Sequence, residues 1–193
     1  MRLLRKRFRG SNKKPFSFIL KPGKRVTIIA RTGSGKTQLA RKIMYDSHML
    51  FVVLNPKNSD DFTGMGNIGT VDGLDLDKVK SIIDSSISKG QVGHVDVRPL
   101  PTDKYKEMDD FILSLHNTYK NIGLLIDELY TVHTPRGEHG PGLTAWLTRG
   151  RARNQSYIGL SQRPRKISLF CLSESDYLIK MHLNLQQDRQ YLA

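Results

Sequence analysis

One segment restricts what this chain can fold into more than any other: ARTGSGKT at residues 30–37. An apolar run, VTII at residues 26–29, comes directly before it, and residues 38–45 have the character of a helix. A strand, a glycine-containing loop and a helix in this order turn several backbone N–H groups toward one point at a helix N-terminus, which makes an anion site. Gly33 and Gly35 permit the backbone angles that such a loop needs. The sequence therefore predicts a phosphate-binding loop.

The side chains of this loop predict which ligand binds there. Lys36 can reach the β- and γ-phosphates of a nucleotide, and the Thr37 hydroxyl can bind Mg²⁺. The consensus GxxxxGK[ST] has glycine where this chain has Ala30, which is a small departure. We therefore expect ATP and Mg²⁺ as cofactors. The residues expected to bind the nucleotide are Thr32, Gly33, Ser34, Gly35, Lys36, Thr37 and Gln38.

The apolar pattern predicts an α/β fold with a mainly parallel sheet flanked by helices on both faces, because strands and helices alternate along the chain. Strands are expected at residues 49–54, 92–97, 122–126, 157–161 and 177–183, and helices around residues 76–87, 105–119 and 143–147, with Thr102 as a candidate N-cap. Residues 16–20 and 26–30 flank a turn sequence and predict an N-terminal hairpin, whereas residues 58–73 predict an irregular segment. We expect one domain at residues 15–193 behind a basic arm at residues 1–14.

The net charge of +13 is concentrated in two segments. Residues 1–14 and 129–166 together hold 14 of the 31 Lys and Arg residues but only one of the 18 acidic residues, so the rest of the chain is neutral. Localised positive charge is typical of a protein with a polyanionic partner. We favour nucleic acid, and the alternative is a solvated tail plus arginines that contact nucleotide or a neighbouring subunit.

Other features exclude some classes of protein. The single cysteine, Cys171, excludes an internal disulfide, favours a reducing environment and is expected to be a small buried apolar residue. No apolar run approaches the ~20 residues of a transmembrane helix, and no signal-peptide core is expected at the start. The loop at residues 131–142 contains two histidines, but neither their spacing nor a nearby cysteine predicts a metal site there. We expect this loop to be flexible, with contact between Arg136 and a phosphate as the weaker alternative.

Two further segments predict hydrolysis. The apolar strand in NIGLLIDELY ends in Asp127 and Glu128, where Asp127 can complete the Mg²⁺ shell beside Thr37 and Glu128 can polarise the attacking water. In YIGLSQRP, Gln162 ends another strand, from which a neutral amide can bond the γ-phosphate or the water. A kinase that transfers phosphate to a small substrate does not require the second carboxylate, whereas a hydrolase does.

The segments ARTGSGKT, LLIDE and GRARNQSYIGLSQRP together resemble the FtsK/HerA superfamily of hexameric DNA-pumping ATPases, over about residues 24–185. Within it, the small size resembles the genome-packaging ATPases of tailless icosahedral viruses with internal membranes. FVVLNPK is similar to the second strand of that family, with Asn55 in place of the usual aspartate. The resemblance implies a P-loop NTPase fold with a RecA-like (ASCE) sheet, in which the Gln162 strand lies between the P-loop strand and the Asp127 strand.

The resemblance also implies a trans-acting arginine just before the glutamine strand. Alignment on SQRP places Arg151 there, with Arg149 and Arg153 as alternatives. The expected catalytic residues are thus Lys36, Glu128, Gln162 and Arg151. The implied partners are double-stranded DNA, a ring of identical subunits (a hexamer or a pentamer), and capsid-vertex or membrane proteins. The basic arm would contact DNA or an anionic membrane, at a virion packaging vertex or in the host cytoplasm.

Three other functions remain open from the sequence alone. A small nucleoside or nucleotide kinase has a similar length, and a cellular HerA- or FtsK-like DNA-processing ATPase shares the motifs. The third alternative is a DNA- or capsid-binding module with a vestigial nucleotide site, against which intact Lys36, Thr37, Asp127 and Glu128 argue. Ring size, pumping polarity, host and the preference for ATP over GTP are not determined by these motifs.

Overall fold

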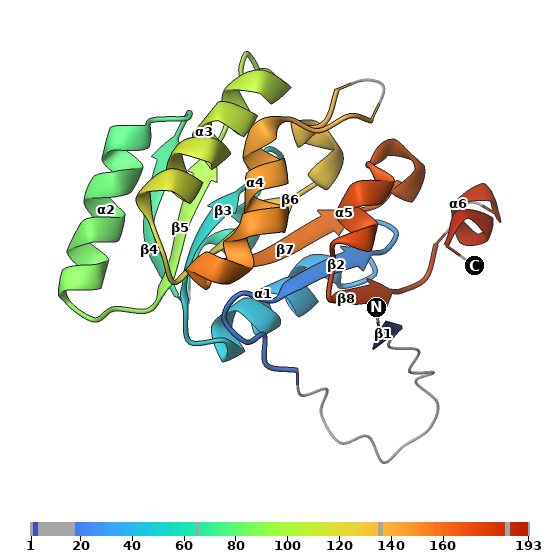
Figure 1. Cartoon of the computed structure of the whole chain (residues 1–193), viewed down its shortest axis with the longest axis horizontal. Coiled ribbons are helices and arrows are strands. Elements are labelled where there is room, and N and C mark those ends of the chain that lie inside the picture. The colour runs from blue at the N-terminus through green and yellow to red at the C-terminus, as the bar shows by residue number, and fades with distance from the viewer. Residues whose placement is uncertain (1, 4–17, 65, 135–136, 184–185, 193) are drawn as a thin grey trace.

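The computed structural model describes residues 2–3, 18–64, 66–134, 137–183 and 186–192. A twisted sheet lies between two helical layers (Figure 1). The basic arm expected at residues 1–14 lies outside the described residues, apart from the two-residue strand β1 (Arg2–Leu3), and Arg136 also lies outside them.

All strand pairs in the described residues are parallel, and the sheet has eight strands in the order β1-β8-β2-β7-β6-β3-β5-β4. The predicted α/β class with a mainly parallel sheet is therefore confirmed. Strand β7 lies between β2 and β6, as the resemblance implied. The longer strands are β2 (Arg25–Ile29), β3 (Leu50–Leu54), β4 (Asn67–Asp72), β5 (Gly93–Arg98), β6 (Ile122–Asp127), β7 (Ser156–Ser161) and β8 (Tyr177–Lys180).

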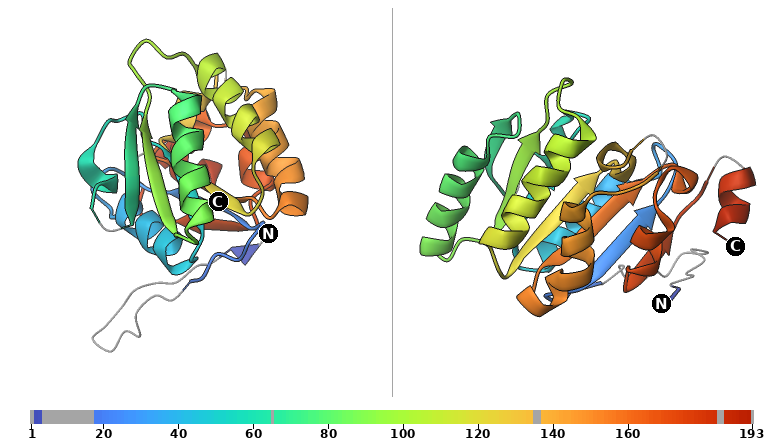
Figure 2. Two further views of the ribbon diagram at one scale, coloured as in Figure 1. Left: turned by 90° about the vertical axis from the view of Figure 1, so that its left-hand side faces the viewer. Right: turned by 45° about the horizontal axis from the view of Figure 1, so that its top comes forward.

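The two faces of the sheet are covered unequally (Figure 2). Four helices, α2 to α5, pack with the larger apolar core, whereas α1 packs with the smaller core on the other face. The central strands are fully buried, as expected for parallel strands covered on both faces. The helices are α1 (Lys36–Asp46), α2 (Leu76–Ser88), α3 (Tyr105–Thr118), α4 (Pro141–Arg149), α5 (Leu169–Ser173) and α6 (Gln186–Tyr191).

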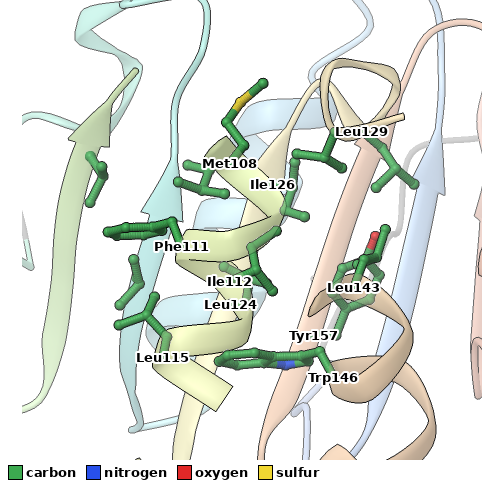
Figure 3. Packing of buried hydrophobic residues seen from close by; sticks show 14 of the residues in the cluster. Met108, Phe111, Ile112, Leu115, Leu124, Ile126, Leu129, Leu143, Trp146 and Tyr157 are labelled. Carbon is green, nitrogen blue, oxygen red and sulfur yellow. The ribbon is translucent and has the colours of Figure 1, made fainter. Parts of the chain in front are cut away.

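Helices α3 and α4 lie side by side over β6 and β7 (Figure 3). Phe111 and Leu115 of α3 and Trp146 of α4 point into this core, and the Trp146 Nε1 donates a hydrogen bond to the Ser156 carbonyl at 3.0 Å. Buried Asp109 accepts hydrogen bonds from two backbone N–H groups in the first turn of α4, each at 2.8 Å. This contact attaches α4, and with it the arginine-rich segment that follows, to the rest of the domain.

The predicted N-terminal hairpin is wrong. Residues 18–20 form no strand, residues 16–17 lie outside the described part, and β2 pairs in parallel with β7 on one side and β8 on the other. Lys24 does close a turn by donating its N–H to the Lys21 carbonyl at 3.1 Å. Both edges of β2 are occupied, however, so the segment before the turn has no place beside it.

Two smaller predictions also fail. The segment at residues 58–73 contains β4, which pairs with β5 at the edge of the sheet although it is rich in polar residues and glycine. The N-cap of α3 is Lys104 and not Thr102, because the Glu107 side chain accepts a hydrogen bond from the Lys104 N–H at 2.9 Å. None of the helices in the described ranges has both the length and the apolar character needed to cross a membrane.

Candidate active site at the carboxyl edge of the sheet

The loop between β2 and α1 has the backbone of an anion site. Gly33 and Gly35 have φ angles of 71° and 82°, which are favourable only for glycine. Helix α1 begins at Lys36, directly after Gly35, with no side chain capping its N-terminus. Among the described residues, no acceptor bonds the N–H groups of Gly33, Gly35, Lys36 and Thr37. These four donors are therefore free for an anionic ligand.

The remaining side chains of the loop differ in their surroundings. Thr37 is half-buried, and Gln38 is exposed on the first turn of α1. Ser34 Oγ donates to the Arg31 carbonyl at 2.7 Å, so this hydroxyl supports the loop itself. The Thr32 hydroxyl donates to the Gln162 side-chain oxygen. The loop is thereby joined to the end of β7.

Buried charges lie directly beside this loop. Asp127, at the end of β6, is fully buried, and its Oδ1 lies 3.8 Å from the Lys36 Nζ. The Lys57 Nζ approaches both Asp127 oxygens at 3.4 Å. These distances are longer than the 2.7–3.2 Å of a good N–H···O hydrogen bond. The Asp127 carboxylate is thus surrounded by cations without being tightly bonded to them.

Glu128 is held more firmly. Its side chain accepts a hydrogen bond from the Gln162 Nε2 at 2.8 Å and pairs with the Lys57 Nζ at 2.9 Å. It is 2% exposed, and its backbone has φ 95° and ψ 71°, in the left-handed region. Such a conformation is unfavourable for a residue with a Cβ and is found preferentially at functional sites. The strained backbone therefore marks Glu128 as a candidate functional residue.

The pKa shifts show that the charges of Lys36 and Asp127 are poorly compensated by their neighbours. Burial is the largest cause that lowers the pKa of Lys36, followed by the neighbouring Lys57 charge. Burial also raises the pKa of Asp127, and the two lysines offset only part of that effect. For Lys57, burial lowers the pKa, but the hydrogen bond to Glu128 and the charges of both carboxylates outweigh it, so the net shift is upward.

These observations fit a magnesium nucleotide. A phosphate group would give Lys36 an anion within bonding distance, and a divalent cation would bind Asp127 more closely than the two lysines do. The four free N–H groups supply the donors that phosphate oxygens need. The Thr37 hydroxyl and the Asp127 carboxylate are oxygen ligands of the kind that Mg²⁺ prefers.

Arg151 lies where the parallel strands begin, at the amino edge of the sheet, whereas the phosphate loop lies at the carboxyl edge. It belongs to the turn η3 (Gly150–Arg153) that precedes β7, whereas Gln162 follows β7. Six residues of strand separate the two, or about 20 Å. The Arg151 side chain is 58% exposed and its Nη2 pairs with the Asp176 Oδ1 at 2.7 Å. Arg151 therefore does not lie in the site formed by its own chain.

The two alternative arginines differ in their bonding. Arg153 donates two hydrogen bonds from its Nη2, to the carbonyls of Asn117 at 2.9 Å and Tyr119 at 3.1 Å, at the end of α3. Arg149 is exposed at the last residue of α4. Arg153 thus serves to join α3 to the segment before β7, whereas Arg149 and Arg151 are presented to solvent.

Sequence reasoning missed Lys57 and Asp176. Lys57 follows the end of β3, next to β6 in the sheet, and carboxyl ends of neighbouring parallel strands meet at one edge. That rule could have found it within the segment FVVLNPK. Asp176 precedes β8 and accepts hydrogen bonds from Lys24, Arg25 and Arg151. No local pattern indicates this role, because its partners are far away along the chain.

No protein-family model matches the chain. A curated relative, the DNA packaging ATPase P9 of Enterobacteria phage PRD1, is 28% identical over 171 residues, which cover 86% of this chain and 67% of the relative. The genome packaging NTPase B204 from Sulfolobus turreted icosahedral virus 2, solved with sulfate, superposes with a TM-score of 0.67 at 15% identity, covering 90% of this chain and 80% of that chain. B204 with ATP-gammaS gives 0.65 at 15% identity, covering 90% and 81%.

The fold extends beyond viral proteins. VirB4 of Thermoanaerobacter pseudethanolicus superposes with a TM-score of 0.59 at 11% identity, covering 87% of this chain and 79% of VirB4. At such identities the superpositions establish the fold, and P9 provides the likeness in sequence. The resemblance of this chain to viral genome-packaging ATPases, inferred above from three motifs, is thereby confirmed.

Proposed function

We propose that this chain is an ATPase that moves double-stranded DNA into a viral capsid, working as a ring in which ATP is hydrolysed between subunits. The observation that carries the proposal is the buried Glu128, held by Gln162 and Lys57 beside the phosphate loop. A second carboxylate after the Mg²⁺-binding Asp127 serves hydrolysis and is not needed for transfer to a small acceptor. The likeness to a DNA packaging ATPase supports the DNA-moving part of the proposal.

Each site residue has a defined task in this proposal. Lys36 and the N–H groups of the loop bind the β- and γ-phosphates. Thr37 and Asp127 hold Mg²⁺, which neutralises phosphate charge when it is bound. Glu128 accepts a proton from the attacking water. Gln162 bonds both Glu128 and the loop residue Thr32, so a change at the phosphates is transmitted to the end of β7.

The position of Arg151 supports hydrolysis at a subunit interface. Its guanidinium lies about one strand length from the phosphate loop of its own chain, so only a neighbour could place it on the γ-phosphate. A guanidinium keeps its charge and can bond two oxygens, which suits the charge that develops in phosphoryl transfer. Arg149 is the remaining alternative, since Arg153 already binds the end of α3.

The proposed partners follow from charge and likeness. The net charge of +13 favours a polyanion such as double-stranded DNA. The ring would be a hexamer or a pentamer attached to capsid-vertex or membrane proteins, at the packaging vertex of the virion or in the host cytoplasm. The basic arm would contact DNA or an anionic membrane.

The proposal is tested by measuring ATP hydrolysis with and without double-stranded DNA, alongside the mass of the assembled protein. We expect DNA to increase turnover and the active species to be a ring. A fully active monomer that ignores DNA and phosphorylates a nucleoside would support the kinase alternative instead. Mixing Arg151→Ala with Glu128→Gln subunits adds a stricter test, because only interfaces between the two variants can combine an intact Arg151 with an intact Glu128.

A further inference from the structure

The fold brings together two histidines and the single cysteine, which are far apart in the sequence. His133 and His139 lie on either side of the loop that follows Glu128, where they form an isolated antiparallel bridge. Cys171 comes from α5, and one donor atom from each residue lies within 4.8 Å of the others. No local sequence pattern indicates this cluster, because Cys171 is far from both histidines along the chain.

The distance between the first two donors matches a metal site. The Cys171 Sγ lies 3.5 Å from the His133 Nε2. In a tetrahedral zinc site, with sulfur at about 2.3 Å and nitrogen at about 2.0–2.1 Å from the metal, the two ligand atoms are about 3.5 Å apart. The His133 Nδ1 lies 2.7 Å from the Leu129 carbonyl, which can only accept, so Nδ1 donates and Nε2 carries the lone pair. This is the usual arrangement of a metal-binding histidine.

One ring nitrogen of His139 has no partner within the described residues. The His139 Nδ1 is buried and has no hydrogen-bond partner there. An unsatisfied buried polar atom is costly and rare. The His139 ring is fixed by stacking on Phe170, with centroids 4.6 Å apart and an interplanar angle of 8°. A simple S–H···N hydrogen bond between Cys171 and His133 would leave this nitrogen unexplained.

The surroundings suit metal coordination. His133 and Cys171 are buried and His139 is half-buried, so the three potential ligands meet inside the protein. Coordination removes the thiol proton outright, because the cation compensates the charge in the apolar interior.

We propose that His133, His139 and Cys171 form a zinc site, with a water molecule in the fourth position. One thiolate and two imidazoles are a ligand set that zinc prefers, and calcium and magnesium do not. The metal would tie the segment that follows Glu128 to α5, which follows the strand carrying Gln162. The proposal does not depend on the proposed function, since its ligands are separate from the nucleotide-binding residues.

The test is a titration of the purified full-length chain, stripped with a chelator and free of nucleotide and Mg²⁺, with Co²⁺ as a spectroscopic probe for zinc. We expect one equivalent to give the intense visible bands of a tetrahedral site and a thiolate-to-cobalt charge-transfer band, and Zn²⁺ to abolish both. The charge-transfer band reports only on Cys171, because no other thiol is present. Co²⁺ bound to Asp127 or Glu128 would not produce it.

Variants separate ligation from folding. His139→Gln removes a proposed metal ligand whose Nδ1 forms no hydrogen bond within the described residues, so the variant should fold normally. It should bind Zn²⁺ at least ~100-fold more weakly, because loss of a ligand should cost no less than loss of a residue that only supports a ligand. Cys171→Ser should abolish the charge-transfer band. His48→Gln replaces an exposed histidine in the turn after α1, outside this cluster, and should bind Zn²⁺ like the unaltered chain. Absence of the charge-transfer band in the unaltered chain, or equal Zn²⁺ affinity in His139→Gln, would overturn the proposal.

Discussion

The two edges of the sheet both carry clustered charges, but they compensate them differently. At the carboxyl edge, Lys36 and Asp127 lie 3.8 Å apart. Burial lowers the pKa of Lys36 and raises the pKa of Asp127, which favours the neutral form of each. At the amino edge, Asp176 accepts four hydrogen bonds between 2.7 and 3.2 Å from Lys24, Arg25 and Arg151. A carboxylate that the protein leaves undercompensated is a place for a ligand, whereas a saturated one joins parts of the fold.

Arg151 lies at the amino edge of the sheet in its own chain. It is proposed to act at the carboxyl edge of the sheet in a neighbouring subunit. We expect Arg151→Ala to lower ATP turnover by on the order of 10³-fold or more while nucleotide binding is retained. The variant lacks the cation that stabilises the negative charge of the transition state. Steady-state hydrolysis and nucleotide titration measure the two effects. Arg153→Ala is the control, and it should lower stability instead.

Mixtures of Arg151→Ala and Glu128→Gln subunits should recover part of the activity. If mixed rings form but stay as inactive as both parents, Arg151 is not the trans-acting residue, and Arg149 becomes the candidate. Recovery would show that the two edges meet between subunits.

Glu128→Gln should reduce turnover by on the order of 10²–10⁴-fold, the usual contribution of a general base. Nucleotide binding should persist, since Lys36, Thr37 and Asp127 are unchanged. Single-turnover hydrolysis and a separate binding titration distinguish the steps. Loss of ATP binding in this variant would mean that Glu128 supports the structure of the site and does not act on water.

Lys57→Met tests whether the carboxyl edge is held together by its lysines. Removing the Lys57 cation leaves buried Glu128 without its ion-pair partner and Asp127 with the more distant Lys36, and we expect a loss of about 1–3 kcal/mol in the free energy of unfolding. This is below the cost for a fully buried pair because the Lys57 side chain is 34% exposed. Urea unfolding measures the loss.

A matched control comes from Lys42, which pairs with Asp46 at 2.7 Å on the exposed surface of α1. Lys42→Met should cost at most about 0.5 kcal/mol. If Lys57→Met and Lys42→Met lower the free energy of unfolding by the same amount, the carboxyl edge is not electrostatically different from an ordinary protein surface.

Asp176→Asn should lower the free energy of unfolding by about 1–2 kcal/mol near neutral pH, because asparagine keeps one acceptor oxygen. Burial alone would raise the pKa of Asp176, but its hydrogen bonds from Lys24 and Arg25 outweigh this and lower it. A depressed folded-state pKa stabilises the fold above the unfolded pKa of about 4, and the stabilisation is lost as the pH falls through the folded pKa. Unfolding curves should therefore show that the unaltered chain exceeds Asp176→Asn in free energy of unfolding at about pH 7, and that this difference is smaller at about pH 3.

The phosphate loop was predictable because its information is local. Gly33 and Gly35 encode the backbone angles within the loop, and the flanking strand and helix are adjacent in the sequence. Asp127 and Glu128 were found in the same way, at the end of a recognisable apolar strand. Such features need no knowledge of tertiary packing.

Other features depend on contacts that no local pattern encodes. Strand β4 escaped prediction because its pairing with β5 outweighs its polar composition. The hairpin was wrong because two distant strands occupy both edges of β2. The approach of Cys171 to His133 likewise arises only when α5 packs against the loop after β6.

The left-handed backbone of Glu128 has a consequence for substitution at this position. The conformation costs of order 1–2 kcal/mol in a residue with a side chain, and glycine would adopt it without strain. Replacement by glycine would relieve this strain, but it would also leave Lys57 and Gln162 without the carboxylate that they bond. In the proposed function, backbone strain and catalysis therefore make opposite demands on position 128, since only the side chain that carries the strain can act on water.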